Sequence, residues 1–192
     1  MKCVLIHPAW SPEEIFPSKT VSSQINYWQP LGTLYVGAAL LEAGHEVEFL
    51  NGAFMDHEAI LARIAEIRPE FVGLYSTTFG FPKAVRTASA IKQIDRDIFV
   101  CVGGPYPMAM KDQCLEHDGA EFDAVVTGEA EQVIVELLER LAEGASFTGL
   151  AGVDFRQGTE IIRNPRRALL EDLDTLPFPA RHLLGDKAHY IP

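Results

Sequence analysis

Short apolar runs that alternate with segments of helical periodicity predict an α/β fold built on a parallel sheet. The run Phe-Val-Gly-Leu-Tyr within residues 71–77 is apolar throughout, as strands covered on both faces by helices tend to be. The chain has 192 residues, a length that fits one ordinary domain plus a tail. We therefore expect a flavodoxin-like (Rossmann-like), doubly wound sheet of five parallel strands flanked by helices, with a small C-terminal hairpin and an extended linker.

The first half of the chain carries three strand-like runs with helical segments between them. The expected strands cover residues 2–7, 46–50 and 71–77. Pro30 opens the first helix, at a position where its missing N–H costs nothing, and Gly44 stops that helix. Asp56 is expected to cap the second helix, which Pro69 ends.

The second half continues the alternation and then changes character. We expect helices over 82–94, near 112–116 and over 131–141, and strands over 98–102 and 122–126. Two short strands then flank Gln157-Gly158-Thr159 as a hairpin. These patterns divide the chain into a main domain over residues 1–145 and a hairpin with a linker over residues 146–192.

Two segments without regular periodicity stand out. The Pro- and Ser-rich loop over residues 8–29 is much longer than a usual β-to-α connection, and loops of that length are usually functional or mobile. The segment 173–181 is rich in proline yet apolar, a composition typical of a segment that docks on a neighbouring domain. We expect the chain to be truncated at this point.

Composition excludes several classes of function. A formal net charge of -11 opposes binding to nucleic acid, which needs clustered Lys and Arg. No apolar run approaches the roughly 20 residues that cross a bilayer, and the first strand lacks a signal peptide's long apolar core, so we expect a cytoplasmic protein. Cys3, Cys101 and Cys114 lie too far apart to predict a disulfide framework or a metal site, and no three-cysteine cluster for an iron–sulfur centre is present.

Ligands of open parallel sheets bind beyond the carboxyl ends of the strands, where strand order reverses. That rule selects five stretches, residues 7–11, 51–53, 76–80, 103–108 and 127–131. By itself Gly103-Gly104 indicates a simple turn. Ser76-Thr77-Thr78 and Gly128-Glu129 follow neighbouring strands, however, so all three segments are expected at one edge of the sheet.

The sequence gives little support for catalytic roles of individual residues. A lone histidine such as His7 at a strand end is more often a hydrogen-bonded wall residue than a metal ligand. Glu129 and Glu131 begin a helix, where the helix dipole favours acidic residues. The dipole explains these two residues about as well as a catalytic role does. The chain contains no Walker or Gly-x-Gly-x-x-Gly pattern, and its residues do not indicate a Ser-His-Asp triad or a catalytic carboxylate pair. We therefore assign no catalytic residue and no metal ligand.

Several segments, taken together and in order, resemble the cobalamin-dependent radical S-adenosylmethionine enzymes. They are residues 30–45, 76–78, 103–107, 128–131 and 172–181, the last containing Leu-Pro-Phe-Pro-Ala-Arg. The match spans nearly the whole chain. That group of enzymes includes methyltransferases acting on unactivated carbon or phosphorus and the anaerobic magnesium-protoporphyrin monomethyl ester cyclase.

The resemblance implies that the main domain binds cobalamin, with the nucleotide tail in the sheet edge and the corrin ring above it. The residues it assigns to cofactor binding are Pro8, Trp10, Leu31, Gly32, Thr33, Tyr75, Ser76, Thr77, Thr78, Gly103, Gly104, Pro105, Tyr106, Gly128 and Glu129. The loop over 7–11 departs from the Asp-x-His-x-x-Gly element of the mutase and methionine synthase types. We therefore expect a base-displaced cobalamin without a histidine below the cobalt.

The resemblance also implies a C-terminal radical S-adenosylmethionine domain, which this chain lacks, holding a 4Fe-4S cluster and S-adenosylmethionine. Alone, the chain is expected to bind cofactor without catalysing a reaction. The alternative is a non-catalytic ligand-binding or signalling domain of the same fold. A receiver would need an aspartate where Ser76 and Thr77 stand, and a flavodoxin relative would need a phosphate-binding loop where residues 8–10 are Pro-Ala-Trp.

Overall fold

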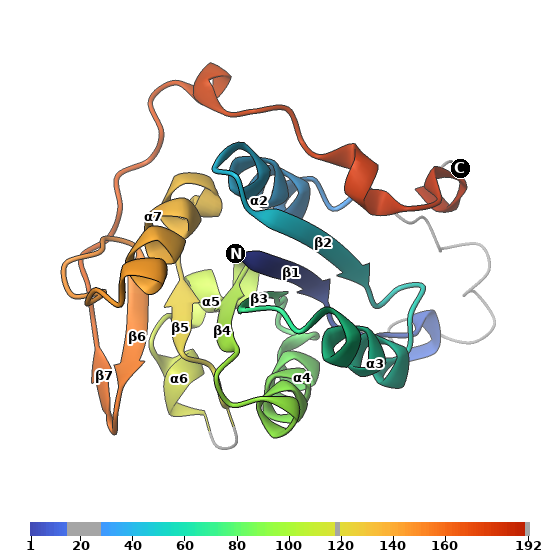
Figure 1. Cartoon of the computed structure of the whole chain (residues 1–192), viewed down its shortest axis with the longest axis horizontal. Helices are drawn as coiled ribbons and strands as arrows, with labels where there is room; N and C mark the ends of the chain where they lie inside the picture. The colour runs from blue at the N-terminus through green and yellow to red at the C-terminus, as the bar shows by residue number, and fades with distance from the viewer. Residues whose placement is uncertain (15–27, 118–119, 191–192) are drawn as a thin grey trace.

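A computed structural model describes residues 1–14, 28–117 and 120–190, and within them one sheet has seven strands in the order β2-β1-β3-β4-β5-β6-β7 (Figure 1). The first five in that order are parallel: β2 (Glu46–Asn51), β1 (Lys2–His7), β3 (Phe71–Tyr75), β4 (Phe99–Gly103) and β5 (Ala124–Val126). Strand order reverses between β1 and β3. The doubly wound fold expected from the sequence is therefore confirmed.

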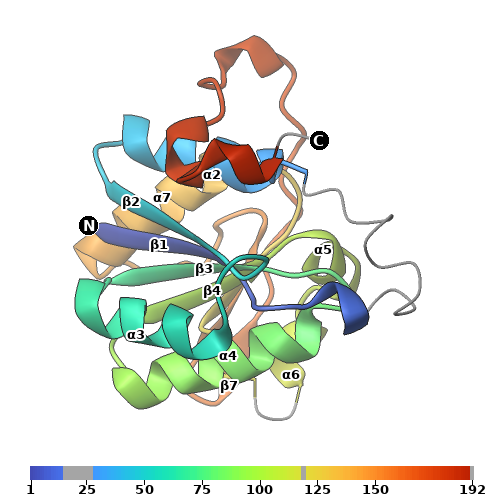
Figure 2. The ribbon, with the colours of Figure 1, turned by 90° about the vertical axis from the view of Figure 1, so that its right-hand side faces the viewer.

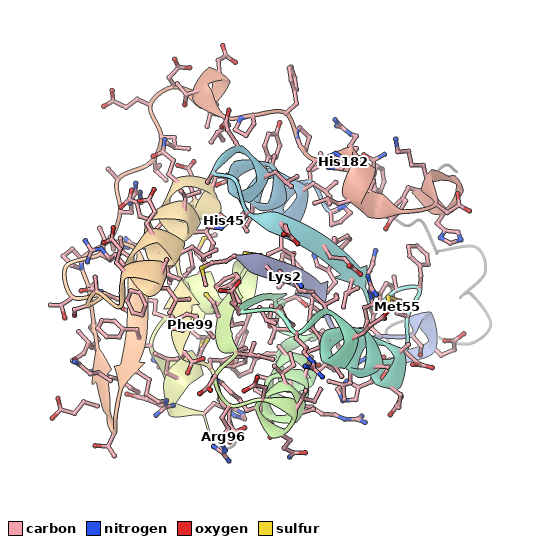
Figure 3. The ribbon with its side chains drawn as sticks, in the orientation of Figure 1. Lys2, His45, Met55, Arg96, Phe99 and His182 are labelled. Carbon is pink, nitrogen blue, oxygen red and sulfur yellow. The ribbon has the colours of Figure 1, made fainter. Side chains whose placement is uncertain are left out.

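Helices cover both faces of the parallel strands (Figure 1 and Figure 2). One face carries α2 (Leu31–Glu42) and α7 (Ala130–Glu143). The other carries α3 (His57–Ile67), α4 (Phe81–Ile94) and the short helices α5 (Pro105–Met110) and α6 (Gln113–Glu116). Each face has its own apolar core, and side chains fill the space between sheet and helices on both sides (Figure 3).

Local sequence signals set the helix ends. Asp56 caps α3, because its Oδ1 accepts a hydrogen bond from the Ala59 N–H at 2.7 Å. Helix α2 begins directly after Pro30. It ends shortly before Gly44, whose φ of 83° reverses the chain toward β2.

Helix α5 is an element that the sequence patterns do not predict. Pro105 stands at its first position, directly after Gly104, and Pro107 follows two residues later. Two prolines in six residues leave no apolar periodicity to signal a helix. The one remaining sign of a helix start is the proline that follows a glycine, and this pair also fits a turn.

The expected hairpin joins the main sheet. Strand β6 (Val153–Gln157) pairs antiparallel with β5, and β7 (Glu160–Ile162) pairs antiparallel with β6. The turn between them contains Gly158 at a φ of 62°. The hairpin thus extends the parallel sheet, and the division of the chain at residue 145 stays a prediction.

The C-terminal tail wraps back over the domain. From β7 it passes α7, crosses α2 and ends beside β2 (Figure 1 and Figure 2). It contains three short 3-10 segments, η2 (Leu173–Thr175), η3 (Arg181–Leu184) and η4 (Lys187–Tyr190). The tail is anchored at its end by Tyr190, which is buried and whose hydroxyl accepts a hydrogen bond from Asn51 Nδ2 at 2.8 Å.

The composition of α2 explains why the tail lies there. This helix is apolar on nearly every side, and a helix of that kind must be covered all round. The sheet covers one side, and the tail covers another: the Ala180 N–H donates to the Leu34 carbonyl at 3.0 Å, and Leu183 packs beside Gly37. The sequence suggested docking on a neighbouring domain. The structure places this part of the tail on its own domain, while Phe178 is 90% exposed.

The structure describes only part of the long loop over residues 8–29. Residues 15–27 of the long loop over 8–29 lie outside the described residues, so its expected role in a site is not addressed by the structure. Before that gap, residues Pro12–Glu14 form a 3-10 turn.

Across the described part of the chain, no helix is both long enough and apolar enough to cross a bilayer.

A partly buried ion pair lies at the end of the sheet opposite the carboxyl edge. Lys92 of α4 is 9% exposed, and its Nζ donates to Asp123 Oδ2 at 2.6 Å and to the Ile98 carbonyl at 2.7 Å. It also reaches the carbonyl of Arg96, which Figure 3 labels in the loop before β4. Asp123 Oδ2 accepts a further hydrogen bond from the Val100 N–H at 2.7 Å. One ammonium group therefore joins α4, β4 and the residue before β5.

Replacement of Lys92 by methionine is expected to lower the free energy of unfolding by roughly 2–3 kcal/mol, because Asp123 then keeps a partly buried charge without its cation. Arg86→Met is the control, since Arg86 and Glu58 form an exposed pair at 3.7 Å and should contribute less than about 1 kcal/mol. Urea unfolding at pH 7 measures both. Equal losses in the two variants would contradict this account of Lys92.

Candidate functional site

A mostly apolar cavity of about 280 Å³ lies between the carboxyl half of the sheet and helices α2 and α7, and we call it the slot. Its sheet side is formed by Leu5, Gly73, Leu74, Tyr75, Cys101, Gly103, Gly104 and Val126. Its helix side is formed by Gly32, Thr33, Val36, Ala130, Glu131 and Ile134, with Gly128 and Glu129 between β5 and α7. The slot lies at the switch point between β1 and β3, where ligands of this architecture bind.

Two glycines in neighbouring strands leave room for the slot. Gly73 pairs with Leu5 on one side and Cys101 on the other, in a row that faces α2 and α7. A Cβ on Gly73 would stand 2.9 Å from Leu5 Cδ2. Gly103 lies in the next row, opposite Tyr75. Since neither residue has a side chain, the helices do not close onto the strands there.

The lip of the slot requires glycine at position 104. Gly104 has a φ of 107°, and a Cβ there would lie 2.8 Å from the Ser76 carbonyl oxygen. The Ser76 N–H donates to the Gly103 carbonyl at 2.8 Å, and the Ser76 carbonyl accepts from the Tyr106 N–H at 3.2 Å. The ends of β3 and β4 are therefore joined through Ser76 and the glycine pair. The sequence predicts these two segments at one edge of the sheet, and the structure places them there.

His7 forms part of the wall beside the slot. Its Nε2 is 2.8 Å from Thr33 Oγ1, and its ring stacks on Tyr75 with centroids 4.3 Å apart and meets Phe49 edge-on. Burial lowers the pKa of His7 to about 4, so the imidazole is neutral at pH 7. This geometry agrees with the interpretation of His7 as a hydrogen-bonded wall residue.

The two acids at the start of α7 have different surroundings. Glu129 Oε2 accepts a hydrogen bond from the Leu170 N–H of the tail at 2.6 Å. Glu131 Oε2 is buried without a hydrogen-bond partner in the described part of the chain. One carboxylate is therefore used by the fold, whereas the other lines the slot with one oxygen unpaired.

The chemistry of the slot favours binding over catalysis. Burial raises the pKa of the Cys101 thiol to about 12, so the sulfur is protonated and not a nucleophile. Thr33 Oγ1 is engaged by His7. Within residues 1–14, 28–117 and 120–190, no three His, Cys, Asp or Glu side chains gather as ligands for a metal ion.

The structure brings seven of the fifteen predicted site residues together around the slot. These are Gly32, Thr33, Tyr75, Gly103, Gly104, Gly128 and Glu129. They come from four separate parts of the chain: α2, the end of β3, the end of β4 with Gly104, and the segment between β5 and α7. Their assignment to a cofactor stays a prediction.

The other eight lie around the slot or away from it. Leu31, Thr78 and Pro105 are exposed near its mouth, whereas Ser76 is fully buried behind it. Three more lie elsewhere: Thr77 Oγ1 accepts from the Gly80 N–H, Tyr106 packs on Phe81, and Pro8 is buried in the loop after β1. Trp10 lines a different depression at the end of β2, where its backbone N–H donates to the Gly52 carbonyl at 3.1 Å.

Nine slot residues lie outside the predicted cofactor-binding set, although the selected stretch 127–131 includes two of them, Ala130 and Glu131. The nine are Leu5, Val36, Gly73, Leu74, Cys101, Val126, Ala130, Glu131 and Ile134. Most look like ordinary core positions, because whether they face the slot depends on strand register. Gly73 offered the one local signal, since a glycine inside an apolar strand often marks a close approach of another group.

A family model described as "B12 binding domain" matches residues 20–138, which is more than half of the chain. This chain is a member of the B12 binding domain family. The match covers α2 to β5 and most of α7, and so includes both helices that wall the slot.

Relatives of this B12 binding domain are longer proteins. An uncharacterized methyltransferase of Pyrococcus horikoshii is 29% identical over 157 residues, which cover 81% of this chain and 34% of that protein. The anaerobic magnesium-protoporphyrin IX monomethyl ester cyclase of Synechocystis is 25% identical over 178 residues, 91% of this chain and 34% of that protein. The chain thus spans about a third of the length of these curated relatives.

Solved structures share the fold. The cobalamin-dependent S-adenosylmethionine radical enzyme OxsB, with aqua-cobalamin and S-adenosylmethionine bound, superposes with a TM-score of 0.77 at 17% identity, covering 98% of this chain and 25% of that one. The radical S-adenosylmethionine methyltransferase TsrM from Kitasatospora setae, with cobalamin and a 4Fe-4S cluster bound, gives 0.69 at 20% identity, covering 92% and 31%.

The lowered pKa of His7 predicts a pH-dependent loss of stability. The unfolded chain protonates His7 near pH 6.5 and the folded chain only near pH 4, so between these values the unfolded state binds more protons and stability falls as pH falls. From pH 7.5 to 5 the His7 contribution to the free energy of unfolding should fall by about 2 kcal/mol.

Urea unfolding of the wild type and of His7→Gln at both pH values measures this. Glutamine has no titrating group, so the variant should lose about 2 kcal/mol less than the wild type over this interval. The shared titration of the other histidines cancels in the comparison. An identical pH dependence in both chains would refute the assignment.

Proposed function

We propose that this chain is the cobalamin-binding module of a radical S-adenosylmethionine enzyme, either a methyltransferase or an anaerobic tetrapyrrole-type cyclase. The observation that carries the proposal is the apolar slot at the switch point of a B12 binding domain. A protonated Cys101 and an engaged His7 leave this slot without a thiolate nucleophile or a free imidazole, which suits a site that holds a cofactor.

The size of the slot indicates which part of cobalamin enters it. Its volume of about 280 Å³ lies just below the roughly 300–1,000 Å³ typical of ligand pockets. It therefore suits one flat arm of the cofactor, the nucleotide tail, and leaves the macrocycle outside. The missing side chains at Gly73 and Gly103 give a planar base access to the sheet.

Exposed apolar side chains that lie close in sequence to slot residues suit the corrin ring. Leu31, Phe79 and Met108 are 43%, 45% and 50% exposed, and each lies within four residues of a slot residue. Large exposed apolar side chains that gather near a cavity mark surfaces that a ligand or another protein covers. A macrocycle seated above the slot would cover these three.

When bound, cobalamin supplies a cobalt centre that carries and transfers a methyl group or takes part in electron transfer. The chain's own residues would bind and orient it. His7 Nε2 already contacts Thr33, so this histidine is not free to lie below the metal. We therefore propose base-displaced cobalamin without a histidine ligand from this chain.

The activity of the whole protein belongs to a part outside this chain. We propose a C-terminal domain that carries the 4Fe-4S cluster and S-adenosylmethionine, and holds the substrate, so the chain alone would not catalyse. The three cysteines are buried and unpaired, as in proteins of the reducing cytoplasm, where we place the module. Against a signalling role, the buried Ser76 stands where a receiver would need an exposed aspartate.

The direct test is a titration of the purified chain with hydroxocobalamin, followed by gel filtration and a visible spectrum. We expect colour to co-elute with the protein at about one cofactor per chain, with the spectrum of base-displaced cobalamin. A spectrum with a histidine below the cobalt would refute the ligation proposal. Absence of retained colour would refute binding by this chain.

Filling the slot should abolish binding without harming the fold. Gly103 has an ordinary φ and only the Val126 carbonyl oxygen, at 3.7 Å, near its missing Cβ. Gly103→Val should therefore keep its unfolding midpoint and weaken cobalamin binding by at least about 10-fold, because the new side chain occupies the slot. Ala65→Val, on the exposed face of α3, is the matched control. Unchanged affinity in Gly103→Val would show that the cofactor binds elsewhere.

A further inference from the structure

One buried polar atom of the slot is left without a partner by the fold. Glu131 is the second residue of α7, and its Oε2 is buried with no hydrogen bond in the described residues. Three other polar side chains of the slot are already engaged: Thr33 by His7, Glu129 by the Leu170 N–H, and the Cys101 thiol by the Val102 carbonyl. Glu131 is therefore the carboxylate that the slot offers to a ligand.

The helix dipole does not account for this placement. An acid in the first turn of α7 is stabilised by the helix N-terminus whether its carboxylate is exposed or buried. Burial of a carboxylate oxygen without a donor reduces stability, since its hydrogen bonds to water are lost and not replaced. A cost of that kind is expected where a bound ligand completes the hydrogen bonds.

We propose that Glu131 recognises the nucleotide tail of cobalamin by accepting a hydrogen bond from one of its hydroxyl donors. This inference rests on the proposed function, because it assumes that the tail enters the slot. A carboxylate only accepts hydrogen bonds, and the ribose of the tail carries hydroxyl donors. The charge of the carboxylate strengthens such a bond, and it also disfavours the anionic phosphate at this point.

The inference makes Glu131 a specificity-determining residue. Cobinamide, which has the corrin ring but lacks the nucleotide, offers no ribose donor to the slot. Loss of the Glu131 acceptor should therefore weaken cobalamin binding and leave cobinamide binding unchanged. A purely structural role for Glu131 would affect both ligands alike.

The experiment measures dissociation constants of hydroxocobalamin and aquacobinamide for the wild type, Glu131→Leu and Glu131→Gln, together with the unfolding midpoint of each cofactor-free chain. Glu139→Leu, at an exposed position of the same helix, is the matched control. Glu131→Leu should bind cobalamin about 10-fold more weakly and cobinamide within about twofold of the wild type. The affinity of Glu131→Gln for cobalamin should lie between those of the wild type and Glu131→Leu, because glutamine keeps a hydrogen-bond acceptor. The cofactor-free Glu131→Leu chain should be at least as stable as the wild type, because it no longer buries an unpaired carboxylate.

The outcomes separate this inference from the proposed function. If the wild type retains neither ligand, the proposed cobalamin function fails. If the wild type binds cobalamin no better than cobinamide, cobalamin binding stands but the nucleotide tail does not use the slot, and the role of Glu131 is refuted. Equal weakening of both ligands, or no weakening of cobalamin binding in Glu131→Leu, also refutes it.

Discussion

Two glycines in neighbouring strands of the sheet keep open the space on which the candidate site depends. Protein interiors pack as densely as organic crystals, so a cavity between a sheet and its helices exists only where side chains are missing. Gly73 and Gly103 provide that gap in β3 and β4, directly beneath α2 and α7. Leu5 and Val126 close the floor on either side of them. The rest of the site, from the His7 wall to the Gly104 lip, is arranged around this opening.

The fold could be predicted from the sequence because its signals are local. Asp56 marks a helix start, Gly44 a helix end, and the apolar run that becomes β3 a covered strand. Each of these is set by a few neighbouring residues, so no knowledge of distant contacts is needed. Helix α5 escaped prediction because its two prolines obscure the periodicity that would have marked it.

The site could be predicted only in part, for a reason of geometry. Residues at strand ends, such as Gly104 and Gly128, follow from the rule that parallel strands finish at one edge. The floor follows from register, which pairs Leu5 with Gly73 and Gly73 with Cys101 across segments far apart in the chain. No local pattern encodes that pairing, and the unpaired oxygen of Glu131 becomes evident only once the surrounding side chains are in place.

The backbone at Gly104 has a consequence for inheritance. A single-nucleotide missense change in any glycine codon yields a residue with a Cβ, and every such Cβ at this position would meet the Ser76 carbonyl oxygen at 2.8 Å. The positive φ of 107° adds a further penalty for side-chain-bearing residues. Codon 104 therefore has no neutral amino-acid neighbour. Variation in this protein should reach the lip of the slot only through synonymous changes.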